Sequence, residues 1–468
     1  MSELSGKTFV GPRLRQLRRE KKQTQAEVAR TLGVSPAYIT LLESNQRSLS
    51  VQMLMKLSEA YGLDWRDLVS DDTAGRVSEL RAAFQDPIFG TEPDLQELRA
   101  AVDHCPTVVQ NLLVLQKNFR RLAETVMRDR SDTGREGMVR SSPEGQVHDF
   151  FRERRNHFAE LEDAASEVRR STALDMDVAF ATLKQRLLVK SQITTEVMSM
   201  TDMAGSLRVY DAGAKRLQIS EAFDYQNKIF QLAHIVGLVE YGDLIEEITA
   251  NASLDGERAH DRLRVELANY FSAALMMPYE AFLADARASG YDIELLATRY
   301  GVSFEQAAHR LTTLQRDGDK GVPFFFLRVD KAGNVTKRFN ATSFQLAEYG
   351  GACPAWNMHT AFRTPGRIIT QRVELPDGAE FFTLCGTTER PYNGSTSEEE
   401  RRLVVALGCP IEYASELVYA ATTPQMPQPI GINCHLCPRQ GCTQRAHQAL
   451  HMELPIDPSR RGSTRYES

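Results

Sequence analysis

The sequence has 468 residues, of which 42% are apolar and 25% are charged, and its formal net charge at pH 7 is −6. This composition is typical of a globular protein and excludes disordered and collagen-like chains. No apolar run approaches the length of a membrane-spanning helix, and residues 1–25 contain no apolar signal segment. We therefore expect a cytoplasmic protein, in which seven cysteines argue against a disulfide framework.

Residues 1–70 are basic, whereas the rest of the chain is acidic. They contain eleven Lys and Arg residues against seven Asp and Glu residues, so they carry a net charge of +4 and the remainder carries −10. A basic head on an acidic body is typical of a protein whose small first domain binds nucleic acid, although a solvated basic helix face gives the same pattern.

Residues 12–68 are predicted to form five short helices. Thr24 and Glu27 have the spacing of a capping box at the start of the second helix, which Gly33 ends. Ser35 caps the third helix. Two short helices joined at a glycine are the arrangement of a helix-turn-helix.

The segment TQAEVARTLGVSPAYITLLESNQRSLS resembles the Cro/C1-type helix-turn-helix of the xenobiotic-response-element family. In this arrangement the second helix of the pair presents its first residues to the major groove, and neighbouring polar residues contact phosphates. An ordinary helical bundle or a protein-binding module is the alternative. The predicted DNA-binding residues are Pro36, Ala37, Thr40 and Leu41 at base edges, Gln25, Asn45 and Arg47 at phosphates, and the cap residue Ser35.

Residues 71–146 are predicted to be a helical linker and dimerisation region. Residues 92–129 indicate a helical hairpin, or a helix kinked at Pro106, with an apolar stripe wide enough for a dimer contact. Residues 130–146 are rich in Gly, Ser, Pro and charge, which indicates a linker. We expect a homodimer or a higher oligomer whose two heads bind a two-fold symmetric operator.

Residues 147–320 are predicted to be mostly helical. The segment IFQLAHIVGLVE resembles the zinc helix of the ImmA/IrrE metallopeptidase family, in which H-E-x-x-H supplies two zinc ligands and a general base. This chain keeps His234 but has Ile235 and Leu238 where the base and the second ligand belong, and Glu266 stands where a third ligand would. We therefore expect a degenerate, non-catalytic domain with His234 in its core.

Residues 321–468 have a more strand-rich pattern. One β-hairpin is predicted from residue 324 and another from residue 367, followed by a helix over the apolar positions from Val404 to Val418. The expected fold class is therefore mostly α in the N-terminal two thirds and α+β in the C-terminal, ligand-binding domain.

Cysteines near the C-terminus have the spacing of a metal site. Zinc accepts four thiolates, or three thiolates with His435 or His447, whereas a [4Fe–4S] cluster requires four thiolates. Reduced thiols without a metal are the plain alternative. We prefer Cys409 as the remote ligand because Gly408 lets the backbone approach a bulky cluster. The candidate ligands are Cys434, Cys437 and Cys442, in a C-x2-C-x4-C pattern, with Cys409 ahead of Cys353 and Cys385 as the fourth.

The helix-turn-helix, the degenerate peptidase-like segment and the CPAWN…IGINCHLCPRQGCTQRAH tail together resemble the short-chain fatty acyl-CoA regulator family over the whole chain. The resemblance implies a transcription factor for acetate or propionate metabolism, a C-terminal domain that binds propionyl-CoA, acetyl-CoA or a related acyl-CoA, and a [4Fe–4S] cluster. An aromatic residue beside an arginine cluster suits the adenine and phosphates of CoA, although solvated arginines on strand faces are an equal alternative. The candidate ligand-binding residues are Trp356, Asn357, His359, Arg363, Arg367 and Arg372.

We predict a DNA-binding transcriptional regulator whose two heads are rearranged when an acyl-CoA binds. A redox sensor that is switched by its cysteine site is a second hypothesis. A stress-response metalloprotease is disfavoured, because the general base and the second zinc ligand are missing.

Overall fold

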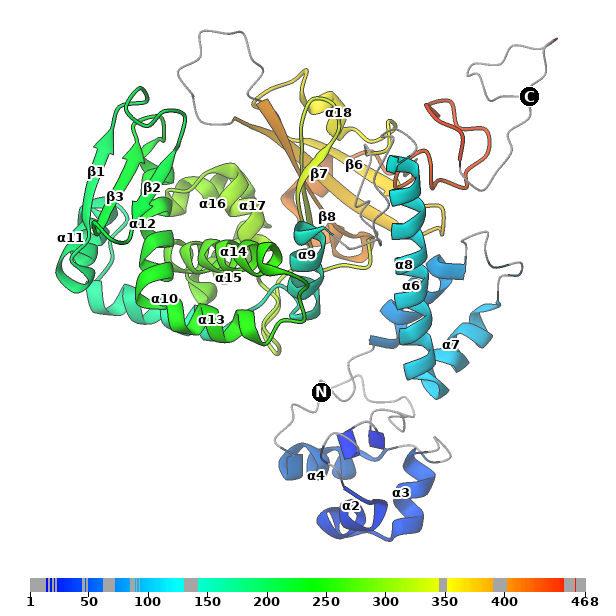
Figure 1. The fold of residues 1–468 in the computed structure, drawn as a ribbon. Helices are drawn as coiled ribbons and strands as arrows, with labels where there is room; N and C mark the ends of the chain where they lie inside the picture. The colour runs from blue at the N-terminus through cyan, green and yellow to red at the C-terminus, as the bar shows by residue number, and fades with distance from the viewer. Residues whose placement is uncertain are drawn as a thin grey trace. The chain divides into compact units, whose positions relative to one another are not determined.

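A computed structural model gives the fold of the chain, which divides into two compact units, residues 1–123 and 124–468 (Figure 1). None of the described helices is long and apolar enough to span a membrane. The residues that the structure describes are 14–15, 17–18, 21, 23–43, 47, 49–61, 72–84, 89, 91, 93–129, 142–344, 352–389, 402–449 and 459.

The first unit begins with short helices that pack around one apolar core. The predicted capping box at Thr24 and Glu27 is present, and Gly33 ends the second helix in the left-handed region at φ 68°. The core is formed by one side of each helix, including Val28, Ile39 and Leu57. The helices are α2 (Gln25–Leu32), α3 (Pro36–Glu43) and α4 (Val51–Tyr61); the predicted helix at 65–69 lies outside the described residues.

Three further helices follow, the last of which, α8, runs past the end of the first unit at residue 123. Asp94 caps α7 through the N–H groups of Gln96 and Glu97. Pro106 starts a new helix rather than kinking one, because α7 ends directly before it. These helices share a small apolar core that includes Leu98. Their bounds are α6 (Asp72–Phe84), α7 (Leu95–His104) and α8 (Pro106–Asp129).

The second unit starts with a helical region that also contains a small sheet. Among the described residues of this region, the strand order is β1-β3-β2, with β1 and β3 parallel and β2 antiparallel at one edge. The sequence analysis predicted a mostly helical region and did not identify these strands. The elements are β1 (Thr194–Met198), β2 (Arg208–Asp211), β3 (Arg216–Ser220), α9 (Pro143–Glu153), α10 (Ala159–Thr172), α11 (Ala179–Ser191), α12 (Tyr225–Glu240), α13 (Gly242–Ala250), α14 (Glu257–Met276), α15 (Tyr279–Ala288), α16 (Ile293–Tyr300) and α17 (Phe304–Leu311).

A buried ion pair connects α10 with α17 inside this helical region. Arg310 Nη1 and Nη2 donate to the two carboxylate oxygens of Glu162 at 2.7 and 2.9 Å. The Tyr270 hydroxyl donates to the same carboxylate at 2.6 Å, and Arg310 Nε donates to the Met277 carbonyl at 3.0 Å. Each charged group is therefore both paired and hydrogen-bonded, which a buried pair requires.

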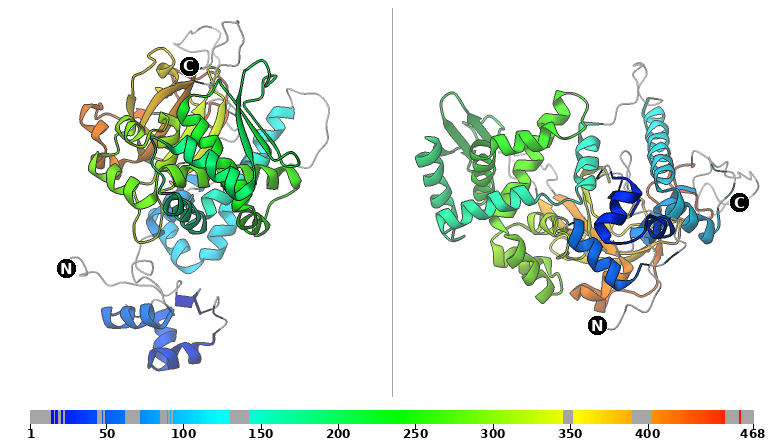
Figure 2. Two further views of the ribbon diagram at one scale, coloured as in Figure 1. Left: turned by 90° about the vertical axis from the view of Figure 1, so that its left-hand side faces the viewer. Right: turned by 90° about the horizontal axis from the view of Figure 1, so that it is seen from below.

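The C-terminal part of the second unit is built on a second, larger sheet. In the described part of the chain it has six strands in the order β5-β4-β8-β7-β6-β9, and Figures 1 and 2 show it and the small sheet on opposite sides of α12 and α14. The predicted α+β class of this domain is confirmed. The elements are β4 (Phe325–Val329), β5 (Val335–Asn340), α18 (Met358–Ala361), β6 (Ile369–Glu374), β7 (Glu380–Glu389), β8 (Arg402–Pro410), β9 (Gln428–Pro429) and two 3-10 turns, η1 (Ile411–Glu416) and η2 (Val418–Thr422).

The predicted helix from Val404 to Val418 is wrong. Its first half is β8, a strand with hydrogen-bonded neighbours on both sides. Residues 403–409 are all buried because both faces of the sheet are covered, and a continuous apolar run of this kind does not alternate as a half-exposed strand does.

The two faces of the large sheet contribute to different cores. Side chains alternate along β8, so Val404 and Ala406 lie on one face while Leu407 and Cys409 lie on the other. The face with Cys409 packs against the helical region. The opposite face packs against Trp356, α18 and the segment that leads into the C-terminal cysteines. This alternation decides which cysteines can meet.

Candidate functional site

The predicted recognition helix, α3, exposes a short and weakly polar surface. The Ser35 hydroxyl accepts from the Tyr38 N–H at 3.2 Å, which caps the helix. Arg47 lies over the Tyr38 ring at 4.9 Å from its centroid, and Asn45 lies outside the described residues. Such a surface suits thymine methyl groups and DNA shape. The exposed predicted contacts on α3 are Pro36, Ala37, Thr40 and Leu41.

The side chain of Gln25 has an internal role that the sequence did not indicate. Its amide nitrogen donates to the buried carboxylate of Glu43 at 2.8 Å, and its amide oxygen accepts from the Thr40 hydroxyl at 3.2 Å. Arg18 also pairs with Glu43, at 2.6 and 3.0 Å. Burial alone would raise the pKa of Glu43, but the hydrogen bonds from Arg18 and Gln25 hold it below its ordinary value. This network fixes α3 relative to α2.

The peptidase-like helix α12 places His234 Nδ1 at the end of a chain of polar side chains, whereas its buried Nε2 has no hydrogen-bond partner among the described residues. His234 Nδ1 lies 2.9 Å from the Asn269 amide oxygen, and the Asn269 amide nitrogen donates to Glu266 at 3.2 Å. Arg262 pairs with the other oxygen of Glu266 at 2.9 Å. Burial, reinforced by the charge of Arg208, lowers the pKa of His234 to about 3. His234 is therefore neutral, and the carboxylate that could serve as a ligand is already paired.

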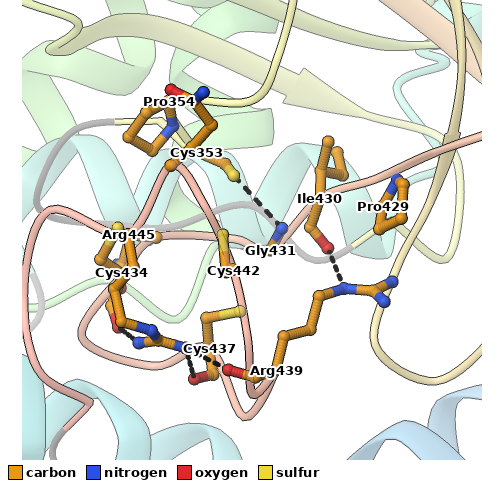
Figure 3. A pocket seen from close by; sticks show the side chains of 12 residues that line it. Cys353, Pro354, Pro429, Ile430, Gly431, Cys434, Cys437, Arg439, Cys442 and Arg445 are labelled. Carbon is orange, nitrogen blue, oxygen red and sulfur yellow. Dashed lines mark hydrogen bonds between the residues drawn. The ribbon is translucent and has the colours of Figure 1, made fainter. Parts of the chain in front are cut away.

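Four cysteines line one small cavity in the C-terminal domain, and Figure 3 shows them as they gather around it. The cavity volume is about 10 Å³, which is the room that about one water molecule needs. All four are free thiols. The four cysteines are Cys353, which precedes α18, and Cys434, Cys437 and Cys442, which lie in residues 430–446, the segment called the cysteine loop below.

The structure does not bring Cys409 to this cavity. Cys409 is fully buried on β8, on the face of the sheet that packs against the helical region, whereas Cys353 belongs to the opposite core. The preference for Cys409 as the fourth ligand is therefore corrected to Cys353. The preference for Cys409 did not take account of β8 being a strand. Side chains alternate along a strand, and this alternation points Cys409 away from the cysteine loop.

Backbone groups approach the sulfur atoms closely. The N–H of Gly431 donates to Cys353 Sγ at 3.4 Å, and the N–H of Ala446 donates to Cys434 Sγ at 3.4 Å. A Cβ atom on Gly431 would lie only 2.6 Å from Cys437 Sγ, so glycine is required by packing at this position. N–H groups directed at sulfur are a means of stabilising thiolates and their metal complexes.

Two arginines hold the cysteine loop in place. Arg445 is buried and donates to carbonyl groups of the loop, and Arg439 fastens the loop to β6. Arg439 Nη2 donates to the Glu374 carbonyl at 2.8 Å and pairs with the Glu374 carboxylate at 3.1 Å. Neither arginine was singled out in the sequence, where only the C-x2-C-x4-C spacing attracts notice.

The four thiols are not yet a closed ligand set. Across the described ranges, no group of three or more His, Cys, Asp or Glu side chains is already arranged to hold a metal ion. Burial raises the pKa of the Cys437 thiol, and the nearby Arg445 charge offsets only part of this effect. Four thiol side chains that line one cavity are nevertheless the donors that a thiolate metal centre needs.

The residues predicted to bind an acyl-CoA are not gathered in one place. Trp356 is buried in the core, where its indole N–H donates to Thr383 at 3.4 Å. Arg372 extends from the other face of β6 and pairs with Glu380 at 3.1 Å. The remaining candidates are Asn357, whose N–H donates to Gln371, His359, whose ring bonds to the Cys353 carbonyl, and the exposed Arg363 and Arg367.

These features together define a DNA-binding transcriptional regulator with a peptidase-like middle region. Residues 14–68 match the helix-turn-helix family, residues 190–312 match the IrrE N-terminal-like domain, and residues 313–466 match the C-terminal domain of short-chain fatty acyl coenzyme A regulators. The chain belongs to the short-chain fatty acyl-CoA regulator family.

Full-length relatives support this assignment. The chain is 37% identical to the propionyl-CoA carboxylase regulator of Cereibacter sphaeroides over 99% of both chains. It is 34% identical to the HTH-type transcriptional regulator PrpR of Mycobacterium tuberculosis, over 99% of this chain and 96% of the relative, and 32% identical to RamB of the same species, over 97% of both. A solved Mycobacterium tuberculosis transcriptional regulator superposes with a TM-score of 0.64 and 34% identity, covering 69% of this chain and 99% of that one.

Proposed function

We propose that this regulator binds a short-chain acyl-CoA through residues 313–466 and that binding changes its affinity for operator DNA. The observation that carries the proposal is the presence, in one chain, of a helix-turn-helix and a short-chain fatty acyl coenzyme A regulator domain. One relative is named a propionyl-CoA carboxylase regulator, which supports propionyl-CoA as the first ligand to test and acetyl-CoA as the second.

Operator binding in the presence of a ligand panel tests this proposal. Fluorescence anisotropy with operator DNA is measured with propionyl-CoA, acetyl-CoA and free CoA. We expect one acyl-CoA to change the operator Kd by roughly 5–150-fold, the usual range of coupling between two sites, and free CoA to change it less. Equal operator affinity with and without every acyl-CoA would contradict the proposal.

The regulator acts as a homodimer in this proposal, and α8 supplies much of the contact. Val108, Leu115 and Phe119 share one face of α8 at helical spacing, and Leu115 is 66% exposed. Leu115→Glu should lower the sedimentation coefficient to that of a monomer and weaken operator binding, whereas Lys117→Glu on the same helix should not. A dimeric Leu115→Glu protein would exclude α8 as the contact.

The peptidase-like region serves as a scaffold without hydrolytic activity. The absence of the general base and of the second ligand from the motif, and the pairing of Glu266 with Arg262, support this role. His234→Gln should leave operator affinity and the acyl-CoA response within a few-fold of the original protein. Proteolytic activity that disappears in this variant would refute the proposal.

The cysteine loop and Cys353 form a metal centre in this proposal. The shared cavity and the two N–H donors to sulfur support four-thiolate binding. Cys353, Cys434, Cys437 and Cys442 would hold the metal, and its role is to fasten the cysteine loop to the rest of the domain. A [4Fe–4S] cluster is the form that the family resemblance favours and zinc is the alternative; the small cavity requires the loop to widen for the cluster but not for one ion.

Anaerobic purification with iron, sulfide and zinc analysis distinguishes these forms. A brown protein with about four irons and four sulfides per chain supports the cluster, and a colourless protein with one zinc supports the alternative. Metal content should be lost in Cys353→Ser and kept in Cys409→Ser. A metal-free folded protein would refute the metal centre. Operator binding compared under air and under anaerobic conditions tests the second hypothesis, a redox switch.

A further inference from the structure

Arg445 differs from the other deeply buried arginines of this protein. Among the described residues, three arginines are buried, namely Arg186, Arg310 and Arg445. Arg310 binds Glu162 through two nitrogens, and Arg186 binds Glu240 with distances of 2.7 to 3.0 Å. The guanidinium group of Arg445, which is only 7% exposed as a residue, has no carboxylate partner in the described part of the chain.

The partners of Arg445 are backbone carbonyl groups of the cysteine loop. Its Nη1 donates to the carbonyls of Cys434 at 3.1 Å and His447 at 3.4 Å. Its Nη2 donates to the carbonyl of Cys437 at 3.2 Å and also to that of Arg439. These bonds satisfy the N–H groups but do not neutralise the charge. A buried charge without a counter-charge is strongly unfavourable, so an anionic group is expected beside it.

The cavity next to Arg445 is where such a group would form. Arg445 lines the cavity together with the four cysteines, and Figure 3 shows its side chain among them. The second arginine at the cavity, Arg439, is paired with the Glu374 carboxylate. Four thiolates carry more negative charge than one divalent ion balances, so a four-thiolate centre is itself anionic.

We infer that Arg445 supplies the positive charge that compensates an anionic four-thiolate metal centre formed by Cys353 and the cysteine loop. This inference rests on the metal centre proposed above. Arg445 is a positioning residue in this arrangement, because it touches the carbonyls of Cys434 and Cys437 and not the metal. Its charge stabilises the loaded centre, and its hydrogen bonds keep the two carbonyls, and hence the two ligands, on one side of the cavity.

Metal titration of the full-length protein with three arginine variants tests the inference. The metal-free protein is titrated anaerobically with Co2+, which is followed by its visible absorption, and the affinity for Zn2+ is then measured by competition. Arg445→Gln keeps hydrogen-bonding capacity but removes the charge, and Arg445→Lys keeps the charge but loses the planar fork. Arg328→Gln is the matched control, because it removes a paired arginine from β4 that does not line the cavity.

We expect Arg445→Gln to bind Zn2+ roughly 10–100-fold more weakly, as is usual when a residue that supports metal ligands is lost. Arg445→Lys and Arg328→Gln should stay within a few-fold of the original protein. Thermal unfolding of the metal-free forms shows whether each variant is folded, and Arg445→Lys keeps the test decisive if Arg445→Gln does not fold. Unchanged affinity in Arg445→Gln, or equal loss in Arg445→Lys, would overturn the inference.

The outcome for the unmodified protein separates this inference from the proposed metal centre. If the unmodified protein binds one ion through its cysteines and Arg445→Gln binds it equally well, the metal centre stands and the inference fails. If the unmodified protein binds neither Co2+ nor Zn2+ and contains no cluster, the metal centre fails first and Arg445 has no charge to compensate.

Discussion

Replacing Glu162 by Gln should be among the most destabilising single changes in the second unit. The substitution preserves shape but leaves the Arg310 guanidinium, which is 0% exposed, without its carboxylate. Removing one partner of a buried, hydrogen-bonded ion pair costs roughly 3–5 kcal/mol, because the other charge remains buried. For a unit of this size we expect the thermal midpoint to fall by about 5–10 °C.

Two comparisons isolate the electrostatic part of this loss. In Glu162→Gln combined with Arg310→Met both charges are absent, so the double variant should recover much of the stability that the single variant loses. Glu280→Gln removes a carboxylate from an exposed pair with Arg316 and should lower the free energy of unfolding by no more than about 1 kcal/mol.

Thermal unfolding followed by circular dichroism at neutral pH provides the measurement. Glu162→Gln unfolding at the same temperature as the exposed control would refute the expected cost of the unpaired charge. A double variant whose loss in free energy of unfolding exceeds the summed losses of the two single variants would refute it as well. Such a result would mean that the interior of this region solvates an unpaired guanidinium group. It would also weaken the inference about Arg445, which depends on the same physical rule.

Three further predictions follow from other parts of the structure. Ala37→Glu should abolish operator binding without unfolding the first unit, because it places a carboxylate on the exposed face of α3; retained binding in an anisotropy titration would exclude α3 as the recognition helix. Gly408→Ala should destabilise the large sheet by roughly 1–3 kcal/mol or more in chemical unfolding, since the added Cβ would lie 2.3 Å from the Phe325 ring, and a neutral effect would contradict the packing of β8 against β4. The folded first unit holds the pKa of Glu43 below its ordinary value of 4.5, so the ionised Glu43 stabilises the fold above that pH. This stabilisation is lost as the pH falls through the lowered pKa, and acid unfolding of Glu43→Gln should lack the corresponding step.

Local signals in the sequence identified the helix-turn-helix well. The capping box at Thr24 and the left-handed residue Gly33 depend on neighbours within a few positions, so their spacing alone predicts α2. The peptidase-like helix was found for the same reason. The hydrogen bond from this helix to Asn269 was not found, because Asn269 lies 35 residues from His234 along the sequence.

The errors in the C-terminal domain have a non-local cause. Residues 403–409 form a continuous apolar run that fits a buried strand or a buried helix, and only the neighbours β4 and β7 decide between them. The fourth candidate ligand depended on that decision. Because β8 is a strand, its side chains alternate, and Cys409 lies on the face that packs against the helical region. Cys353 is the remote cysteine that lines the cavity.

The short strand β9 bears on the solubility of truncated forms of this protein. β9 is a pair of residues, Gln428 and Pro429, and it covers the end of the β6 edge at Val373 and Glu374. The chain continues from it into the cysteine loop, and Arg439 returns to bond the Glu374 carbonyl on that edge. An uncovered sheet edge is a template for pairing with other chains. We therefore expect truncations that end before residue 428 to precipitate, even where their helix-turn-helix is intact.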